Sequence, residues 1–198
     1  MPPTAGSSTA DAEQQPRFYY DLASPESYLV AERALHALDA VPEWIPVSVG
    51  EVGPFRCAEE VASYKEDLSR RAQALGLMPL RWPEPWPGNT LTAMRAAVFA
   101  KQTGRAVAFS LAAFRQAFAG GRDLGERDSV LIAAAACEMH PAAVVKGAGL
   151  GSIAARLETA TAEAAAAGVL DVPALVLDGG RVFHGDRELE RAAAVRAA

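Results

Sequence analysis

The sequence is poor in cysteine, and the two cysteines that it has lie far apart. Among its 198 residues only Cys57 and Cys137 are cysteine. Their separation and unlike surroundings exclude a redox Cys-x-x-Cys motif and a zinc site built on cysteine pairs, so we expect no metal site. Two incidental thiols in a reducing cytoplasm are the favoured interpretation, and a structural disulfide is the alternative.

Strong positive charge and long apolar runs are also absent. The net charge of −5 gives no electrostatic basis for binding nucleic acid or an anionic membrane. The alanine-rich runs are broken by Glu, Arg and Gly, well short of the ~18 apolar residues of a membrane span. Residues 1–16 lack the basic start and apolar centre of a secretory signal, so we expect a disordered tail. These absences predict a cytoplasmic protein that binds neither nucleic acid nor membrane.

What the chain does have is a core-forming composition and an orderly succession of strands and helices. Hydrophobic residues make up 51% of it, enough for a buried core. The aromatic-rich stretch 17–22 predicts a strand, and apolar residues at steps of three and four predict a helix from Pro25 to near Asp39. A second strand is predicted at 44–49, where Pro46 favours a sheet edge or a bend.

The middle of the chain is predicted to be helical. A polar helix is expected at 57–75, and the four prolines of 78–89 predict a packed irregular loop. Apolar spacing then predicts further helices, one of which ends near His140-Pro141. These helices are centred on 91–98, 107–118, 130–135 and 153–164.

The C-terminal part returns to strands. Residues 173–177 and 181–184 predict two strands joined by a tight turn at 178–180, with a last helix beginning near Asp186. Because a helix joins the first two strands, these should run parallel, and the hairpin should complete a four-stranded mixed sheet. The predicted fold class is therefore α/β. We divide the chain into a tail at 1–16, an α/β domain formed by 17–56 and 168–198, and an inserted α-helical domain at 57–167.

A short motif between the first strand and the first helix carries a resemblance. The sequence SPES at 24–27, with the later Val172-Pro173, resembles the DsbA-like branch of the thioredoxin fold. More closely, YYDLASPESYLVAERAL is similar to the active-site segment of kappa-class glutathione transferases and 2-hydroxychromene-2-carboxylate isomerases. YKEDLSRRAQALGL, PGNTLTAMRAAVFA and GVLDVPALVLDGGRVFHGDREL also agree, so the resemblance spans residues 17–195. It implies a thioredoxin-like fold with a helical insertion.

The resemblance implies a role for each residue of this site. Ser24 stands where redox relatives carry the nucleophilic cysteine, and in the family it donates a hydrogen bond to the sulfur of bound glutathione. A thiol has a pKa of about 8.5, which a helix N-terminus and an extra donor lower, so such a site favours the thiolate. Pro173 is expected to be cis, with the backbone of Val172 pairing with the thiol. Asp186 would hold the amino end of glutathione, and Ser27, at the second cysteine position, would also contact the bound thiol.

Most candidate residues also have a plain structural interpretation, which stays open at this point. Pro173 can simply begin a strand, and Asp186 can be a helix N-cap. Ser24 can be an ordinary helix N-cap followed by proline, and Ser27 can simply lie in the first helical turn. Asn89 can cap a helix rather than contact a substrate. Tyr20 and Trp82 can pack in the core or at its rim rather than stack on a substrate.

Two stretches depart from the family pattern. Arg71 replaces a tryptophan of the family, and the loop before its helix lacks the family's asparagine and second lysine. The C-terminal Gly-x-Asp-Arg pattern is one residue shorter at Asp186. Both changes concern the expected contacts with glutathione, so the cofactor is either glutathione or another low-molecular-weight thiol.

Serines at both cysteine positions exclude dithiol redox chemistry through the motif. The leading hypothesis is an isomerase of 2-hydroxychromene-2-carboxylate isomerase type, in which a small thiol adds to an aromatic electrophile and leaves again. The alternatives are a kappa-like thiol transferase and a non-catalytic module that binds an extended peptide against Val172-Pro173. The resemblance also implies that two copies can form a homodimer.

Overall fold

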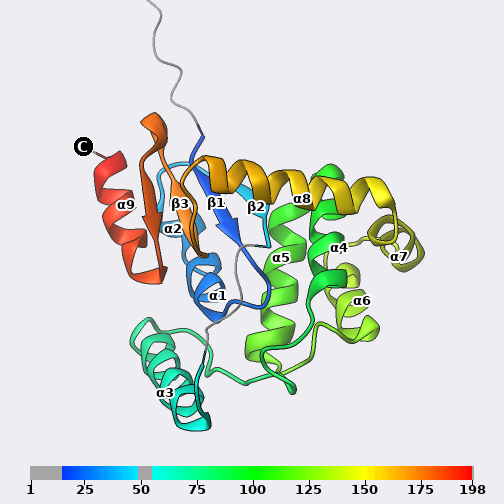
Figure 1. Cartoon of the computed structure of the whole chain (residues 1–198), viewed down its shortest axis with the longest axis horizontal. Coiled ribbons are helices and arrows are strands. Elements are labelled where there is room, and N and C mark those ends of the chain that lie inside the picture. Colours follow the sequence, from blue (N-terminus) through cyan, green and yellow to red (C-terminus); the bar gives the residue numbers. More distant parts are fainter. Residues whose placement is uncertain (1–14, 49–54, 198) are drawn as a thin grey trace, which may run out of the picture.

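The computed structural model describes residues 15–48 and 55–197. Within them, four strands form one sheet in the order β2-β1-β3-β4 (Figure 1). β1 runs parallel to β2, and β3 pairs antiparallel with both β1 and β4. The strands are β1 (Arg17–Tyr20), β2 (Glu43–Pro46), β3 (Ala174–Val176) and β4 (Val182–His184).

This arrangement confirms the predicted four-stranded mixed sheet. β2 lies at one edge, as its proline indicated. The predicted turn between the last two strands is a short 3-10 segment, η2 (Asp178–Gly180), in which Gly179 and Gly180 have φ angles of 73° and 77°. Only glycine adopts this left-handed conformation without a steric cost, which explains the glycine pair. The predicted tail falls almost wholly outside the described residues.

The helix predicted from Pro25 to Asp39 is two helices. α1 (Pro25–Ala31) ends at Glu32, and α2 (Ala34–Ala37) follows as a single turn. The break lies at Arg33, whose side chain turns back to donate to the carbonyl of Leu29 at 2.9 Å and reaches the carbonyl of Asp186 at 2.8 Å. The apolar spacing continued across this break, so the sequence pattern alone indicated one helix.

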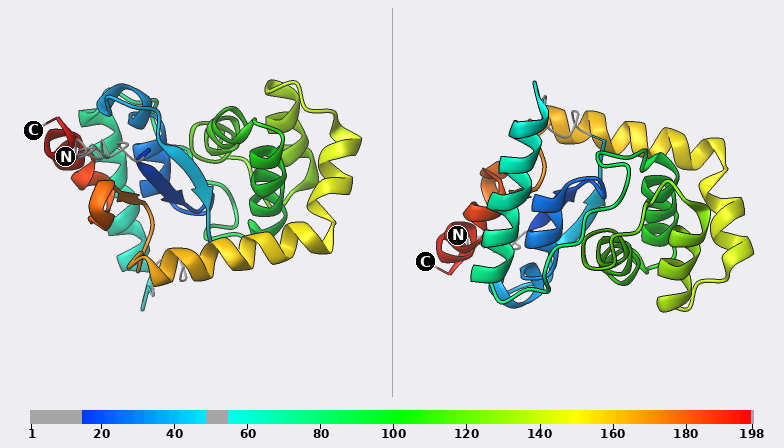
Figure 2. Two further views of the ribbon diagram at one scale, coloured as in Figure 1. Left: turned by 90° about the horizontal axis from the view of Figure 1, so that it is seen from above. Right: turned by 90° about the horizontal axis from the view of Figure 1, so that it is seen from below.

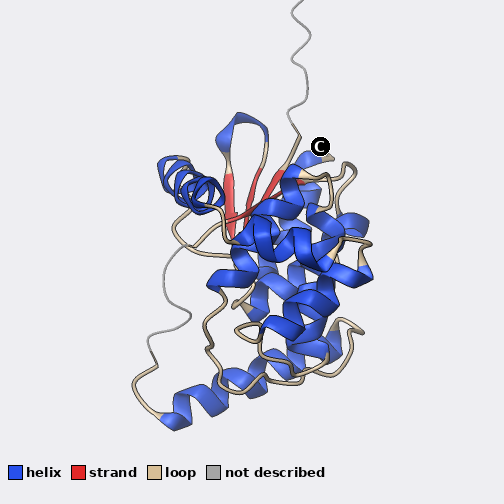
Figure 3. Ribbon diagram, turned by 90° about the vertical axis from the view of Figure 1, so that its right-hand side faces the viewer, coloured by secondary structure: helices blue, strands red, loops and turns tan. Residues whose placement is uncertain are grey.

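Helices make up most of the remaining chain and lie on both sides of the sheet (Figure 3). The block predicted around 107–118 continues from an α-helix into a π-helix, η1, and stops before the predicted Gly120-Gly121. The last helix is preceded by a 3-10 turn, η3. The elements are α3 (Ala58–Ala74), α4 (Leu91–Gln102), α5 (Ala106–Phe114), η1 (Arg115–Ala119), α6 (Arg127–Ala136), α7 (Pro141–Ala148), α8 (Gly151–Ala166), η3 (Asp186–Glu188) and α9 (Leu189–Arg196).

Helix α7 was not predicted. Pro141 indicated the end of the preceding helix, whereas it is the first residue of a new one. The side chain of His140 accepts a hydrogen bond from the backbone N–H of Ala142 at 3.2 Å and so caps α7. A proline at the first helical position lacks only an N–H that would have no partner there, so it can start a helix as readily as it stops one.

The proline-rich segment 78–89 has no regular helix or strand, as predicted. Two of its peptide bonds, Glu84-Pro85 and Trp86-Pro87, are cis. The segment nevertheless packs closely, because Trp82 and Trp86 lie edge-to-face with their rings 4.7 Å apart. It therefore forms a fixed aromatic wall beside the start of α1.

The two faces of the sheet pack against different layers. On one face Phe18, Tyr20 and Trp44 meet α5, with the rings of Tyr20 and Phe114 5.7 Å apart. On the other face Tyr19 packs with a smaller apolar cluster that includes Ala164 of α8. This alternation along β1 follows from the two-residue period of a strand. α8 extends from the sheet to α7 at the far end of the molecule (Figure 2).

The thioredoxin-like sheet and the helices share one large apolar core, to which α1, α4, α5, α6 and α8 all contribute. The proposed division at 57 and 167 stays a prediction. α3 packs beside α1 and away from the other inserted helices (Figure 1). No helix in the described ranges is both long enough and apolar enough to span a membrane.

Candidate functional site

Ser24 lies where β1 has ended and α1 begins. Its backbone is extended, its N–H donates to the carbonyl of Asp21 at 3.1 Å, and its hydroxyl oxygen accepts the N–H of Ser27 at 3.1 Å. It is thus a regular N-cap, followed by a proline. No acceptor for the Ser24 hydroxyl hydrogen occurs among the described residues. The side chain therefore caps the helix and keeps one donor unused.

Val172 and Pro173 lie at the same end of the sheet as Ser24. Tyr19 pairs with Ala174 in the antiparallel β1–β3 ladder, so Pro173 lies beside Tyr20, the last residue of β1. The Val172-Pro173 peptide bond is cis, as the resemblance implied. The N–H of Val172 donates to the carboxylate of Asp171 at 2.7 Å, so a ligand strand would have to displace that bond.

Asp186 reaches the motif through a guanidinium group. Arg71 of α3 contacts the carboxylates of Asp186 in η3, Glu26 in α1 at 3.2 Å and Asp67 at 3.0 Å. The side chain of Asp186 is only 5% exposed and that of Arg71 17%. Burial raises the pKa of Glu26, and the contact with Arg71 opposes this rise. We call Arg71, Asp67, Glu26 and Asp186 the Arg71 cluster. It joins α3, α1 and η3, and its member Glu26 is two residues from Ser24 in the sequence.

Asp21 is a buried carboxylic acid just before the motif. Its side chain accepts the backbone N–H of Ala23 at 2.8 Å and the hydroxyl of Thr90 at 3.4 Å. Burial raises the pKa of Asp21 to about 6, and both hydrogen bonds act in the opposite direction. The group can therefore exchange a proton close to neutral pH.

Two tryptophans of the proline-rich segment, Trp82 and Trp86, form what we call the indole pair. The indole N–H of Trp86 donates to the carbonyl of Ala23 at 3.3 Å, directly before Ser24. The ammonium of Lys65 lies 5.0 Å from the ring centre of Trp82 and 5.3 Å from that of Trp86. No carboxylate lies within ion-pair distance of Lys65 in the described part of the chain. A half-buried cation on an aromatic wall thus borders the motif.

Three predicted site residues are placed differently. Tyr20 has no exposed surface and its hydroxyl is bonded to that of Ser110 at 2.5 Å, so it belongs to the core and offers nothing to a substrate. Ser27 is also fully buried, and its hydroxyl has no hydrogen-bond partner among the described residues, so its predicted contact with a thiol is not available. Asn89 is exposed and accepts the N–H of Leu91 at 3.0 Å, which fits the capping alternative.

Neither cysteine joins another. Cys57 is exposed, Cys137 is buried, and both are free thiols, so the disulfide alternative is wrong. In the ranges that the structure describes, no three His, Cys, Asp or Glu side chains gather closely enough to hold a metal ion.

A known domain family covers nearly all of the described residues. The DSBA-like thioredoxin domain matches residues 17–195. The chain belongs to this family. No curated protein matches the sequence.

Solved structures with the same fold include proteins of different activity. A 2-hydroxychromene-2-carboxylate isomerase is 20% identical with a TM-score of 0.81, over 93% of this chain and 95% of the other. A probable DsbA oxidoreductase from Streptomyces coelicolor is 21% identical with a TM-score of 0.74, over 91% and 88%. The cytosolic disulfide reductase DsbM from Pseudomonas aeruginosa, in a structure with GSH, is 15% identical with a TM-score of 0.66, over 93% and 96%. These likenesses show the fold.

Three site residues escaped the sequence reasoning. Asp21 directly precedes the SPES segment. A carboxylate between an aromatic strand and the start of a helix could have indicated it as a site residue. Arg71 was noticed only as a departure, although an arginine in place of an apolar residue calls for carboxylate partners. The position of Lys65 could not be predicted, because its aromatic partners Trp82 and Trp86 lie in an irregular loop without a periodic sequence pattern.

Proposed function

We propose that this protein is a thiol-dependent isomerase of the 2-hydroxychromene-2-carboxylate isomerase type, acting on an aromatic electrophile. The observation that carries the proposal is the unused hydroxyl hydrogen of Ser24, at the N-terminus of α1 and at the sheet end that holds the cis proline. A serine there can donate to sulfur but cannot form a disulfide. Dithiol exchange through the motif is therefore excluded, which separates this chain from its oxidoreductase neighbours.

Ser24 would act as a donor, not as a nucleophile. When bound, the thiol supplies the sulfur that adds to the electrophile and is released unchanged. The Ser24 hydroxyl would donate to that sulfur and lower its pKa, with the N-terminal end of α1 contributing in the same direction. Asp21 is available to hold a proton near pH 6 three residues away, within the range useful for general acid–base work.

The indole pair and Lys65 support an aromatic substrate that carries an acidic group. Flat rings favour stacking on indole, and the ammonium of Lys65 has no described carboxylate to neutralise it. An aromatic carboxylate would satisfy both features. Trp82 keeps its proposed substrate contact on this basis, whereas Tyr20 does not.

The residues around the motif fit a small thiol and leave its identity open between glutathione and another one. Asp186 is already paired with Arg71, and the Val172 N–H with Asp171, so the amino end and the thiol-bearing residue of a glutathione molecule would compete with existing bonds. The bond between the Val172 N–H and Asp171 also speaks against the peptide-binding alternative, which needs the Val172 backbone free. A kappa-like transferase uses the same donor and differs only in the fate of the thiol adduct. A homodimer is also part of this proposal.

Thermal unfolding with saturating thiols tests the thiol site. A ligand at about 100 times its dissociation constant adds roughly 2.7 kcal/mol of stability, which should raise the Tm of the wild type by about 5–10 °C. In Ser24→Ala and Ser24→Gly this rise should shrink, and Gly preserves most of the capping. Ser152→Ala, which removes an exposed hydroxyl on α8, should keep it. No rise with any thiol would contradict the proposal.

Turnover tests the isomerase step. With 2-hydroxychromene-2-carboxylate as the probe, we expect a thiol-dependent isomerisation rate that falls about 100-fold in Ser24→Ala, as when an aimed donor is removed from an active site. Consumption of the thiol in proportion to product would favour the transferase instead. A thiol that binds without any turnover of aromatic electrophiles would leave a binding module.

A further inference from the structure

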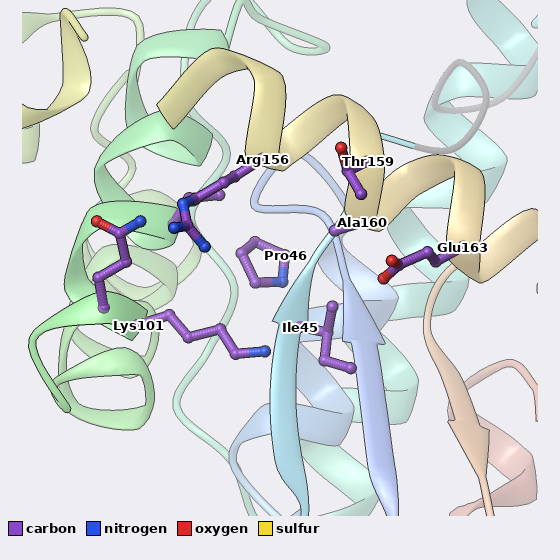
Figure 4. A pocket seen from close by; sticks show the side chains of 9 residues that line it. Ile45, Pro46, Lys101, Arg156, Thr159, Ala160 and Glu163 are labelled. Atoms are coloured by element: carbon purple, nitrogen blue, oxygen red, sulfur yellow. The ribbon is translucent and has the colours of Figure 1, made fainter. Parts of the chain in front are cut away.

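A pocket with a volume of about 600 Å3 lies between the outer edge of β2 and helices α4 and α8 (Figure 4). We call it the β2 pocket. It shares no lining residue with the Ser24 motif, the cis proline, the Arg71 cluster or the indole pair. Its volume is within the range of sites that hold a drug-sized ligand. The proposed function makes no use of it.

The floor of the β2 pocket is apolar. Ile45 and Pro46 of the edge strand form it, flanked by Val98 of α4 and Ala160 of α8. Edge strands often recruit another strand, but Pro46 has no N–H to donate to one. A compact molecule with an apolar body suits this floor better than an added peptide strand.

Two cations approach the floor from opposite helices. Arg156 extends from α8 and Lys101 from α4, with their charged ends toward Pro46 (Figure 4). Lys101 is paired with Glu43 at 2.6 Å. Arg156 has no carboxylate within ion-pair distance in the described part of the chain, and its neighbours one turn away on α8 are Ser152, Ile153, Thr159 and Ala160.

The acidic group of the pocket lies at its other end. Glu163 is next to Ile45, away from Arg156 (Figure 4). An anion beside Arg156 therefore need not approach this carboxylate. Arginine presents a planar set of donors that matches a carboxylate, so the end of the pocket near Arg156 suits that group.

We propose that the β2 pocket is a second binding site, for an organic carboxylate with a compact apolar body. The carboxylate pairs with Arg156, and the apolar body covers Ile45 and Pro46. This site is independent of the thiol site, because the two share no residue. It would let a small organic anion bind the protein without occupying the proposed thiol site.

A matched pair of probes tests this site. Titration calorimetry with 2-naphthoate and its neutral amide, 2-naphthamide, separates the charge from the apolar body. In a Lys65→Gln background, which removes the cation beside the indole pair, we expect 2-naphthoate to bind about tenfold more tightly than 2-naphthamide, and Arg156→Gln to remove that difference. Arg181→Gln makes the same charge change in the exposed β3–β4 turn and should leave both affinities unchanged.

A second variant tests the cavity itself. Ala160→Trp fills the pocket and should abolish the binding of both probes at an unchanged far-UV circular dichroism spectrum. Because Lys65 and the indole pair could also take 2-naphthoate, Ala160→Trp is likewise titrated in the Lys65→Gln background. Binding of 2-naphthoate that is already lost in Lys65→Gln alone, or that survives Arg156→Gln and Ala160→Trp in that background, would overturn the proposal, and so would no binding of 2-naphthoate at millimolar concentration.

Discussion

The Arg71 cluster and the β2 pocket differ in how their charges are partnered. Arg71 is surrounded by three carboxylates and is 17% exposed, so its charge is satisfied within the chain. Arg156 lines the β2 pocket, and Lys65 lies beside the indole pair. Neither has a carboxylate partner among the described residues. Substituting one member of a buried ion pair is strongly destabilising, because its partner is left buried without a counter-charge. Substituting an exposed charge that has no partner changes the free energy of unfolding little. The first kind should therefore govern stability and the second kind binding.

The largest effect is expected from Arg71→Met. It leaves the nearly buried carboxylate of Asp186, only 5% exposed, without its cation. Breaking a buried pair from one side costs about 3 kcal/mol or more. In a chain of this size the Tm should fall by about 6–12 °C, measured by calorimetry.

The neighbouring arginine is the control for this change. Arg70 has a side chain 68% exposed and approaches Asp67 at only 3.4 Å. Arg70→Met should change the free energy of unfolding by about 0.5 kcal/mol or less, as for most surface pairs. Equal losses in the two variants would mean that the Arg71 cluster is not a structural ion-pair network.

The second effect concerns pH. The carboxyl of Asp21 has an ordinary pKa of 3.8 and a pKa of about 6 in the folded protein, because it is buried. The folded state thus binds this proton more tightly, and the stability it contributes is complete below pH 4 and is lost as the pH rises through 6. Between these limits, wild type should lose roughly 3 kcal/mol relative to Asp21→Asn.

Chemical denaturation of both proteins from pH 4 to pH 7 measures this difference. Glu158→Gln, which removes an exposed carboxylate from α8, corrects for the general change in charge. A constant difference between wild type and Asp21→Asn across the range would show that Asp21 has the same pKa in both states.

Part of the fold could be predicted from the sequence, and part could not. The parallel pairing of the first two strands and the C-terminal hairpin were predictable, since a helical connection and a glycine-rich turn are local signals. The cis proline was predictable from the resemblance. The break at Arg33 was not, because it depends on a carbonyl of Asp186 that lies far along the chain. The prediction that Tyr20 contacts a substrate was wrong for a related reason. Whether a strand residue faces the core or a ligand depends on what packs against it, and here α5 covers Tyr20.

The candidate site shows the same limit. Ser24 could be found from its neighbours in sequence, whereas Arg71 meets Asp186 only through the packing of α3 on α1. Lys65 is placed by the indole pair, and irregular loops carry no periodic pattern from which such a contact could be predicted. The sequence therefore located the donor Ser24 and the carboxylate of Asp186, but not the contact of Asp186 with Arg71 or the place of Lys65 on the indole pair.

Lys65→Gln should change binding and leave stability nearly intact. The KM for an aromatic carboxylate substrate should rise about tenfold with kcat little changed, since the ammonium binds the substrate and its transition state alike. The Tm should move by less than about 2 °C. Lys146→Gln, at an exposed position of α7, makes the same change far from the motif and should leave KM unaltered. A fall in kcat with an unchanged KM would contradict this role.

The smallest effect separates the two serines of the motif. Ser24→Ala removes the N-cap bond to the Ser27 N–H and should cost about 1 kcal/mol. Ser27→Ala removes a buried hydroxyl that has no described partner, so the free energy of unfolding should change by about 0.5 kcal/mol or less, or rise. Urea denaturation of both variants compares them directly. If Ser27→Ala lowers the free energy of unfolding as much as Ser24→Ala does, the Ser27 hydroxyl must be hydrogen-bonded in solution. The two serines of the motif would then contribute equally to stability.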